Sequence, residues 1–175
     1  MIETVKNAVH SFAVYLVGLV GLSEAFANYV YVLIISMLPI IELRGALPVA
    51  FALGLPVIPS FIVSIAGNVL PVPFILLLIT PVCNYLKKTR FFSWLPEFLE
   101  RKVEKNREKV TKYANFGLFL FVAIPLPGTG AWTGALIASF LDFKFKDALI
   151  SIICGVITAG IIMGIFSYGL LGLIF

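Results

Sequence analysis

Two long hydrophobic stretches of this chain are interrupted at their centres by residues that bind charge or reverse the backbone. The first interruption carries an acid and a base two positions apart, Glu42 and Arg44, followed by Gly45 and Pro48. The second is the run from Pro125 to Gly130. Because hydrocarbon offers no water to free backbone groups, broken helices occur at membrane depth only where protein or a wet cavity surrounds them. The two breaks therefore predict a binding site or a pathway within a bilayer.

Glu42 and Arg44 are the two side chains best suited to chemistry. An acidic group at bilayer depth is disfavoured and normally faces a cavity or a partner. Glu42 is therefore a candidate for exchanging protons or for pairing with a cationic substrate. Arg44 is a candidate for holding an anionic headgroup, because its planar guanidinium suits phosphate. The alternative is that the two side chains pair and stabilise the turn, or lie shallowly at the interface.

The second break combines a turn with the start of a helix. Structurally, its prolines and glycines let a hairpin reverse. Functionally, exposed N–H groups at the start of a helix after Gly130 attract anions; the two interpretations are compatible. The candidate substrate- and proton-binding residues are Glu42, Arg44, Gly45, Pro48, Pro127, Gly128, Thr129 and Gly130, with Asn68, Trp132 and Thr133 as secondary candidates.

No enzyme active site is recognisable in the sequence. The two cysteines, Cys83 and Cys154, lie in apolar segments, and His10 is the only histidine. The chain lacks a nucleophile–base set, a metal-ligand cluster and a glycine-rich nucleotide loop. We therefore expect a protein that is not an enzyme and that holds no metal or cofactor.

The composition predicts an all-α integral membrane protein. Of the 175 residues, 61% are hydrophobic and 13% charged, and the mean hydropathy is +1.07. Soluble domains have about 45–50% apolar and about 25% charged residues. We expect a single membrane domain that contacts membrane lipid.

A basic linker divides the chain. Residues 87–112 hold nine Lys or Arg and four Glu, a net charge of +5 (9 − 4). Short loops rich in Lys and Arg stay cytoplasmic, which places this linker on the inner side of the cell membrane. Glutamates at helical spacing within it predict a solvated surface helix. Because the cytoplasmic placement of the linker accounts for its positive charge, we do not expect nucleic-acid binding.

The first half, residues 1–86, contains three kinds of apolar segment. Residues 1–22 predict either an interfacial helix or a tilted span. Ala27–Ile41 and Ala46–Leu55 are each too short to cross a core of about 30 Å, which favours a re-entrant hairpin, with one kinked span as the alternative. Val57–Leu86 is long enough to cross, and Pro71 and Pro73 should kink it.

The second half, residues 113–175, repeats this order. Asn115–Leu126 and Gly130–Leu141 form the second broken pair, and Phe145–Phe175 contains a final span. One hairpin plus one span gives an odd number of crossings, so the halves should be inverted repeats, a recurrent transporter design. Small residues in the last span support either a homodimer or packing of the two halves.

The motifs Glu42–Pro48 and Pro125–Ala135 resemble the putative small multidrug export protein family, over nearly the whole chain. That family is similar to the wider DedA, or SNARE-associated, superfamily. The resemblance implies two opposed re-entrant hairpins, movement of polyprenyl phosphate or phospholipid, and dependence on the proton-motive force. Glu42 matches the acid of the first hairpin and Pro127-Gly128 the Pro-Gly of the second. The arginines that often flank that Pro-Gly are missing, which leaves Arg44 to bind phosphate.

These observations predict a DedA-like membrane transporter of an anionic lipid carrier, proton-coupled through Glu42. The first alternative is a small-molecule exporter of cationic amphiphiles in which Glu42 is the charge partner. The second is a membrane scaffold that organises lipid without transporting it.

Overall fold

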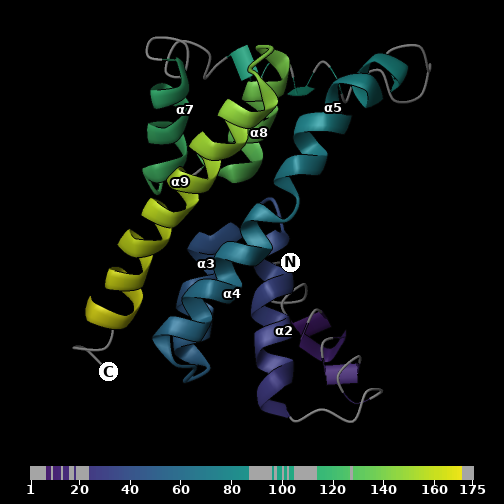
Figure 1. Ribbon diagram of the computed structural model, residues 1–175. Coiled ribbons are helices and arrows are strands. Elements are labelled where there is room, and N and C mark those ends of the chain that lie inside the picture. The colour runs from purple at the N-terminus through teal and green to yellow at the C-terminus, as the bar shows by residue number, and fades with distance from the viewer. Residues whose placement is uncertain are drawn as a thin grey trace. The chain divides into compact units, whose positions relative to one another are not determined.

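The computed structural model describes residues 7–8, 10–12, 14–15, 18, 24–86, 96, 98–99, 101, 103–104, 114–126 and 128–170. Within these residues all regular structure is helical, as the sequence predicts (Figure 1). Most of the predicted segment 1–22 and of the linker 87–112 lies outside them. The chain forms two compact units: Met1–Asn68 with Ala159–Phe175, and Val69–Thr158.

Two long helical segments have the length and composition of membrane spans. They are Val57–Cys83 and Phe145–Gly169. Both carry large apolar side chains that the protein leaves uncovered, which a soluble fold would bury. In these two segments the apolar side chains more than half exposed are Ile58, Ile62, Phe74, Leu77, Leu78, Ile150 and Ile165. The exposed apolar surface is what a lipid-facing helix requires.

The first unit is built on a helical hairpin. Helices α2 (Glu24–Met37) and α3 (Glu42–Ala52) lie side by side. At about 1.5 Å per residue they are roughly 21 Å and 17 Å long, so neither crosses a ~30 Å core alone. The unit also contains α4 (Val57–Val69), the end of α9 (Phe145–Gly164) and the π-helical η1 (Ile165–Leu170).

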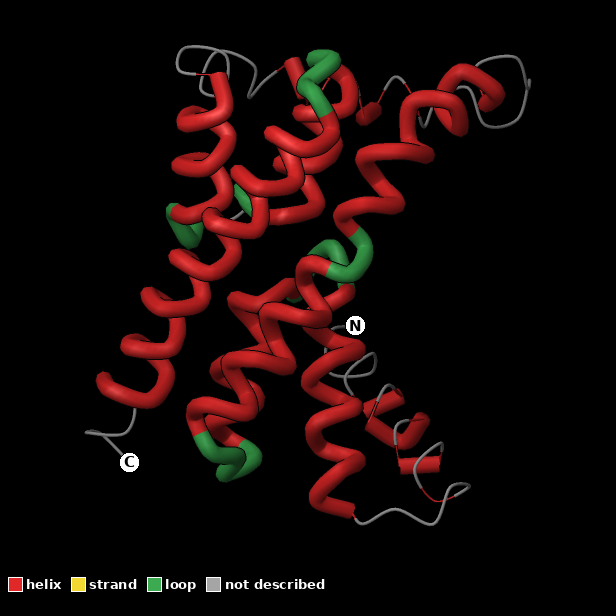
Figure 2. The backbone as a smooth tube through the Cα atoms, viewed as in Figure 1, coloured by secondary structure: helices red, strands yellow, loops and turns green. Residues whose placement is uncertain are grey.

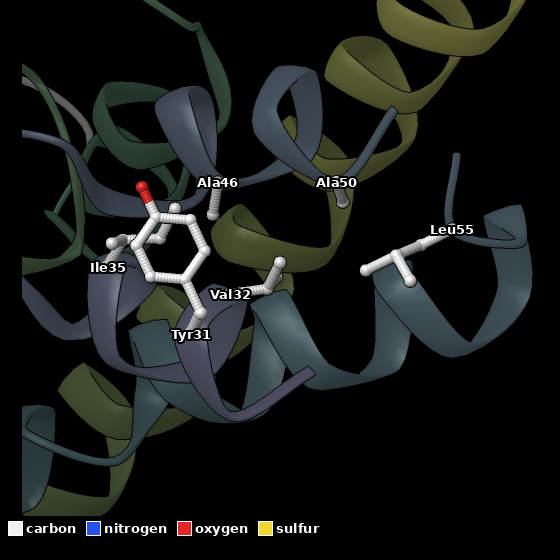
Figure 3. Close-up of a cluster of buried hydrophobic side chains, with 6 residues drawn as sticks. All are labelled: Tyr31, Val32, Ile35, Ala46, Ala50 and Leu55. Carbon is white, nitrogen blue, oxygen red and sulfur yellow. The ribbon is translucent and has the colours of Figure 1, made fainter. Parts of the chain in front are cut away.

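A compact apolar cluster holds this hairpin together. It takes three side chains from α2, two alanines from α3 and one leucine from the turn that follows α3 (Figure 3). The small alanines let the two helix backbones approach closely. The members are Tyr31, Val32, Ile35, Ala46, Ala50 and Leu55.

The second unit has a hairpin of its own. Helices α7 (Ala114–Ala123) and α8 (Ala131–Phe140) contact each other, and α5 (Val72–Leu86) packs against α8. The Ser139 hydroxyl lies 2.9 Å from its own helix carbonyl at Ala135 and 3.4 Å from the carbonyl of Leu76 on α5. The first part of α9 completes the unit.

Short loops separate the helices (Figure 2). Most of these loops contain proline or glycine, whereas the loop between α8 and α9 contains Asp142 instead. The first predicted span is interrupted at an expected proline, because α4 ends at Val69 and α5 begins at Val72, with Pro71 between them. The predicted second span begins at Phe145 as a single helix and changes to π-helical turns at Ile165.

The turn after each hairpin is the same in both units. The Leu55 N–H donates to the Ala50 carbonyl, and the Phe143 N–H donates to the Ala138 carbonyl, both at 3.0 Å. These bonds are 88 positions apart (143 − 55), and the helices that follow, α4 and α9, also begin 88 apart (145 − 57). The two turns and the helix starts that follow them are therefore related by one offset of 88 positions.

Each of these turns contains one residue with a positive φ, which is a glycine in the first half and an aspartate in the second. Gly54 (φ 67°) and Asp142 (φ 53°) both lie in the left-handed region, which favours glycine after a helix end. A Cβ at Gly54 would meet nothing within 4 Å. Gly54→Ala should therefore lose about 1 kcal/mol from backbone conformation alone, and Asp142→Gly should gain about 0.5 kcal/mol. Thermal unfolding in detergent checks both, and equal melting temperatures would contradict the prediction.

Candidate functional site

The first break places Glu42 in an unusual backbone conformation. The N–H groups of Ile41 and Glu42 both donate to the Leu38 carbonyl, at 3.2 and 2.9 Å, and reverse the chain after α2. Glu42 is the first residue of α3, has φ 50° and is only 6% exposed. A left-handed conformation costs a non-glycine residue about 1–2 kcal/mol. Such strain, observed at a buried acid, marks a candidate functional position.

The residues after Glu42 keep the break tight. Arg44 is half-buried and interacts electrostatically with Glu42. A side chain at Gly45 would collide with the Ile41 side chain, so glycine lets the break fold onto α3. Pro48 lies inside α3 and has no N–H, so it makes no helical hydrogen bond to the preceding turn. The acid, the base, the glycine and the proline thus share one short helix.

The start of α3 differs from the prediction. The sequence placed Glu42 and Arg44 in the break, with the helix beginning near Gly45, but α3 begins at Glu42. The Gly45 N–H donates to the Ile41 carbonyl at 3.0 Å, so helical bonding starts before the glycine. The break is confined to the four residues 38–41, and the good helix formers Leu43 and Arg44 continue the helix directly after the left-handed Glu42.

The second break uses its threonine internally. The Thr129 hydroxyl lies 2.8 Å from the Ile124 carbonyl and 2.9 Å from the Leu126 carbonyl. Gly128 has φ 82°, a conformation that L side chains rarely adopt. These features give the Pro-Gly run the turn-forming role that the sequence predicts. Pro127 lies outside the described residues.

Helix α8 starts where the sequence predicts, directly after Gly130. This glycine is buried and extended, and the Gly134 N–H donates to its carbonyl at 2.8 Å. Thr133 is buried within the first turn, whereas Trp132 is half-buried. The predicted anion site at this helix start stays a prediction.

Two buried polar side chains, those of Ser64 and Ser167, were not among the candidates predicted from the sequence. Asn68, a secondary candidate, is 4% exposed, and its side-chain oxygen has no hydrogen-bond partner. The hydroxyls of Ser64 and Ser167 are also buried without a hydrogen-bond partner. These two serines lie in the same compact unit as Asn68. The spacing of four between Ser64 and Asn68 was the available signal, because it puts both on one helix face.

The candidate residues divide between the two units. Glu42, Arg44, Gly45, Pro48 and Asn68 belong to the first unit, and Gly128, Thr129, Gly130, Trp132 and Thr133 belong to the second. Over the described part of the chain, no group of three His, Cys, Asp or Glu side chains could hold a metal ion.

A family model described as "Putative small multi-drug export protein" matches residues 42–162. The match begins at Glu42, directly after the first break, and spans the second break and most of α9. Neither the curated proteins nor the solved structures include a match. The family model covers more than half of the chain, and two apolar helices have the length of membrane spans. The chain is therefore a membrane protein that belongs to the putative small multi-drug export protein family.

Proposed function

We propose that the chain exports small amphiphilic molecules across the cell membrane, with Glu42 as the charge partner of a cationic substrate. The observation that carries the proposal is the buried, strained Glu42 at the break of a hairpin whose arms are too short to span. An acid at this depth binds a cation or a proton, because an isolated carboxylate is costly in hydrocarbon. The description of the family supports the same class of activity.

Arg44 supports a second candidate function, the movement of an anionic lipid carrier such as polyprenyl phosphate or a phospholipid. Its side chain is less buried than that of Glu42, so an incoming anion meets the guanidinium first. A guanidinium binds a phosphate through paired hydrogen bonds. In this DedA-like mechanism Glu42 exchanges protons, and its protonation changes the net charge beside the Arg44 guanidinium, which itself stays charged.

The repeated turn supports an inverted-repeat architecture for either function. In this arrangement each hairpin is re-entrant, and the two open toward opposite faces of the membrane. The basic linker 87–112 lies on the cytoplasmic side, together with the open end of the second hairpin. The first hairpin, including Pro56 after its second arm, then opens to the outer face.

Single cysteines test this topology. In a variant lacking Cys83 and Cys154, we expect Phe26→Cys and Pro56→Cys to react with an impermeant thiol reagent from outside intact cells. Asn115→Cys and Asp142→Cys should react only after the membrane is opened. All four labelling sites replace exposed residues at hairpin ends. Labelling of the Phe26 and Pro56 positions from opposite faces would rule out the hairpin.

Purified protein in liposomes separates the two candidate functions. The probes are tetraphenylphosphonium, a lipophilic cation, and a fluorescent short-chain polyprenyl phosphate. If the cation is the substrate, Arg44→Ala should raise its apparent affinity about threefold to tenfold, ~0.7–1.4 kcal/mol, because a like charge is removed. If the phosphate is the substrate, the same variant should stop its movement.

Lys146→Ala is the matched control, since it also removes one positive charge but from an exposed position in the first turn of α9. It should leave both activities unchanged. Movement of neither probe by the wild-type protein would overturn both transport proposals and favour a lipid-organising scaffold.

A further inference from the structure

Helix α4 carries a line of polar residues on the face that the protein encloses. Ser60, Ser64 and Asn68 are spaced four apart, so they lie along one side of the helix. All three are buried, whereas Ile58 and Ile62 of the same helix are 72% and 59% exposed. The helix is therefore polar toward the protein and apolar toward its surroundings. We call Ser60, Ser64 and Asn68 the polar stripe.

Most of the polar stripe is unsatisfied by protein. The Ser64 hydroxyl and the Asn68 side-chain oxygen have no hydrogen-bond partner, and neither has the Ser167 hydroxyl on η1. Leaving a buried polar atom unpaired is costly, so such groups are retained where water or a ligand reaches them. Among the described residues, every buried polar side-chain atom of this kind lies in the first unit.

The second half shows that helix packing does not require these polar groups. At the offset of 88 that relates the two turns, the polar stripe corresponds to Ala148, Ile152 and Val156 of α9. All three are buried and apolar, at 0%, 0% and 1% exposure. The same place in the repeated fold is thus filled by hydrocarbon in one half and by unpaired polar groups in the other.

The polar stripe has a defined direction within its unit. At one end the Ser60 hydroxyl donates to the Pro56 carbonyl at 2.7 Å and lies close to Tyr168. The Tyr168 hydroxyl donates to the Leu55 carbonyl at 3.1 Å, in the turn that closes the hairpin. At the other end Gly67, next to Asn68, packs against Ser36 in the last turn of α2. That last turn leads directly into the break that holds Glu42.

We propose that the polar stripe, together with Ser167, lines an internal water path in the first unit that runs from the Tyr168 end toward Glu42. Water supplies both donors and acceptors, which hydroxyl and amide groups need, and no charged group of the stripe calls for an ion. The π-helical form of η1 agrees with this, since such turns are frequent at functional sites. The path gives the buried carboxylate contact with solvent on the side where the first hairpin opens. Its role in export rests on the proposed function.

Thiol accessibility tests the path without any transport assay. In the variant lacking Cys83 and Cys154, the polar-stripe variants are Ser64→Cys and Asn68→Cys. The matched controls are Ile152→Cys and Val156→Cys at the corresponding positions of α9. A small charged methanethiosulfonate reagent reacts with thiols that water reaches. We expect the two stripe cysteines to react at least tenfold faster than the two controls.

Equal labelling rates at all four positions, whether fast or slow, would overturn the proposal. A second measurement covers the case in which a cysteine variant folds poorly. Ser64→Ala and Asn68→Val insert apolar residues like those of the second half. Both should melt at or above the wild-type temperature, because each removes a buried oxygen that has no hydrogen-bond partner in the protein. A clear fall in melting temperature for both would show that the groups are structural.

The outcomes also separate this inference from the proposed function. Fast labelling of the stripe in a protein that exports neither probe would leave the water path standing and remove the exporter. Export of a probe by the protein, together with polar-stripe cysteines that do not react, would keep the proposed function and overturn the water path.

Discussion

Glu42→Gln is expected to reduce export of the cationic probe at least tenfold, corresponding to about 1.4 kcal/mol or more. The amide keeps the size and shape of the side chain but carries no charge. The carboxylate is buried at the break of the first hairpin, where a cationic substrate has few alternative partners. Initial rates in proteoliposomes, compared at equal protein incorporation, measure the effect. Export that continues at the wild-type rate would remove Glu42 from the site.

Glu42→Gly separates the role of the carboxylate from that of the backbone. Because φ is 50°, glycine should relieve strain and stabilise the protein by about 1 kcal/mol, while export is lost as in Glu42→Gln. Glu42→Asp keeps the charge and should retain part of the activity. A Glu42→Gly variant that melts lower than wild type would mean that the carboxylate stabilises the fold by more than the strain costs.

Gly155→Ala is expected to destabilise the protein by about 1–3 kcal/mol, the usual cost of overpacking. A Cβ at this position would lie 2.7 Å from the Val122 Cβ and 3.0 Å from the Phe119 carbonyl oxygen. The carbonyl oxygen belongs to the α7 backbone, so it cannot move aside as a flexible side chain would. The melting temperature and the yield of folded protein in detergent measure the effect.

Gly164→Ala is the matched control on the same helix. A Cβ at Gly164 meets nothing within 4 Å, so alanine should be neutral or should gain up to about 1 kcal/mol from helix propensity. Equal stability of Gly155→Ala and Gly164→Ala would contradict the close approach of α9 to α7.

The same close approach is found in the first unit. Gly67 is 88 positions before Gly155, and a Cβ there would collide with the Ser36 hydroxyl and the Leu33 carbonyl oxygen of α2. In both units a glycine on the long helix packs against the last turns of the first hairpin arm. The offset of 88 positions therefore relates these two glycine contacts as well as the two turns.

The sequence alone predicted the helical elements well. Continuous apolar runs indicated helices, Pro71 marked the interruption of the first span, and Gly130 marked the start of α8. These predictions succeeded because proline and glycine act on the local backbone, and because chain length limits what can cross hydrocarbon. The start of α3 was misplaced, because the propensity of Glu42-Leu43-Arg44 for helix outweighed the glycine that follows.

The tertiary structure decided which polar groups are enclosed. In so apolar a chain, hydropathy does not distinguish the enclosed face of α4 from its exposed face, so Ser64 was not recognised before packing buried it. The left-handed backbone of Glu42 and the internal bonds of Thr129 also depend on how each break closes. The sequence determined a membrane protein of broken hairpins and long spans, because composition and backbone chemistry act locally. Only folding decided where its buried polar surface lies, because burial depends on contacts between residues distant in the chain.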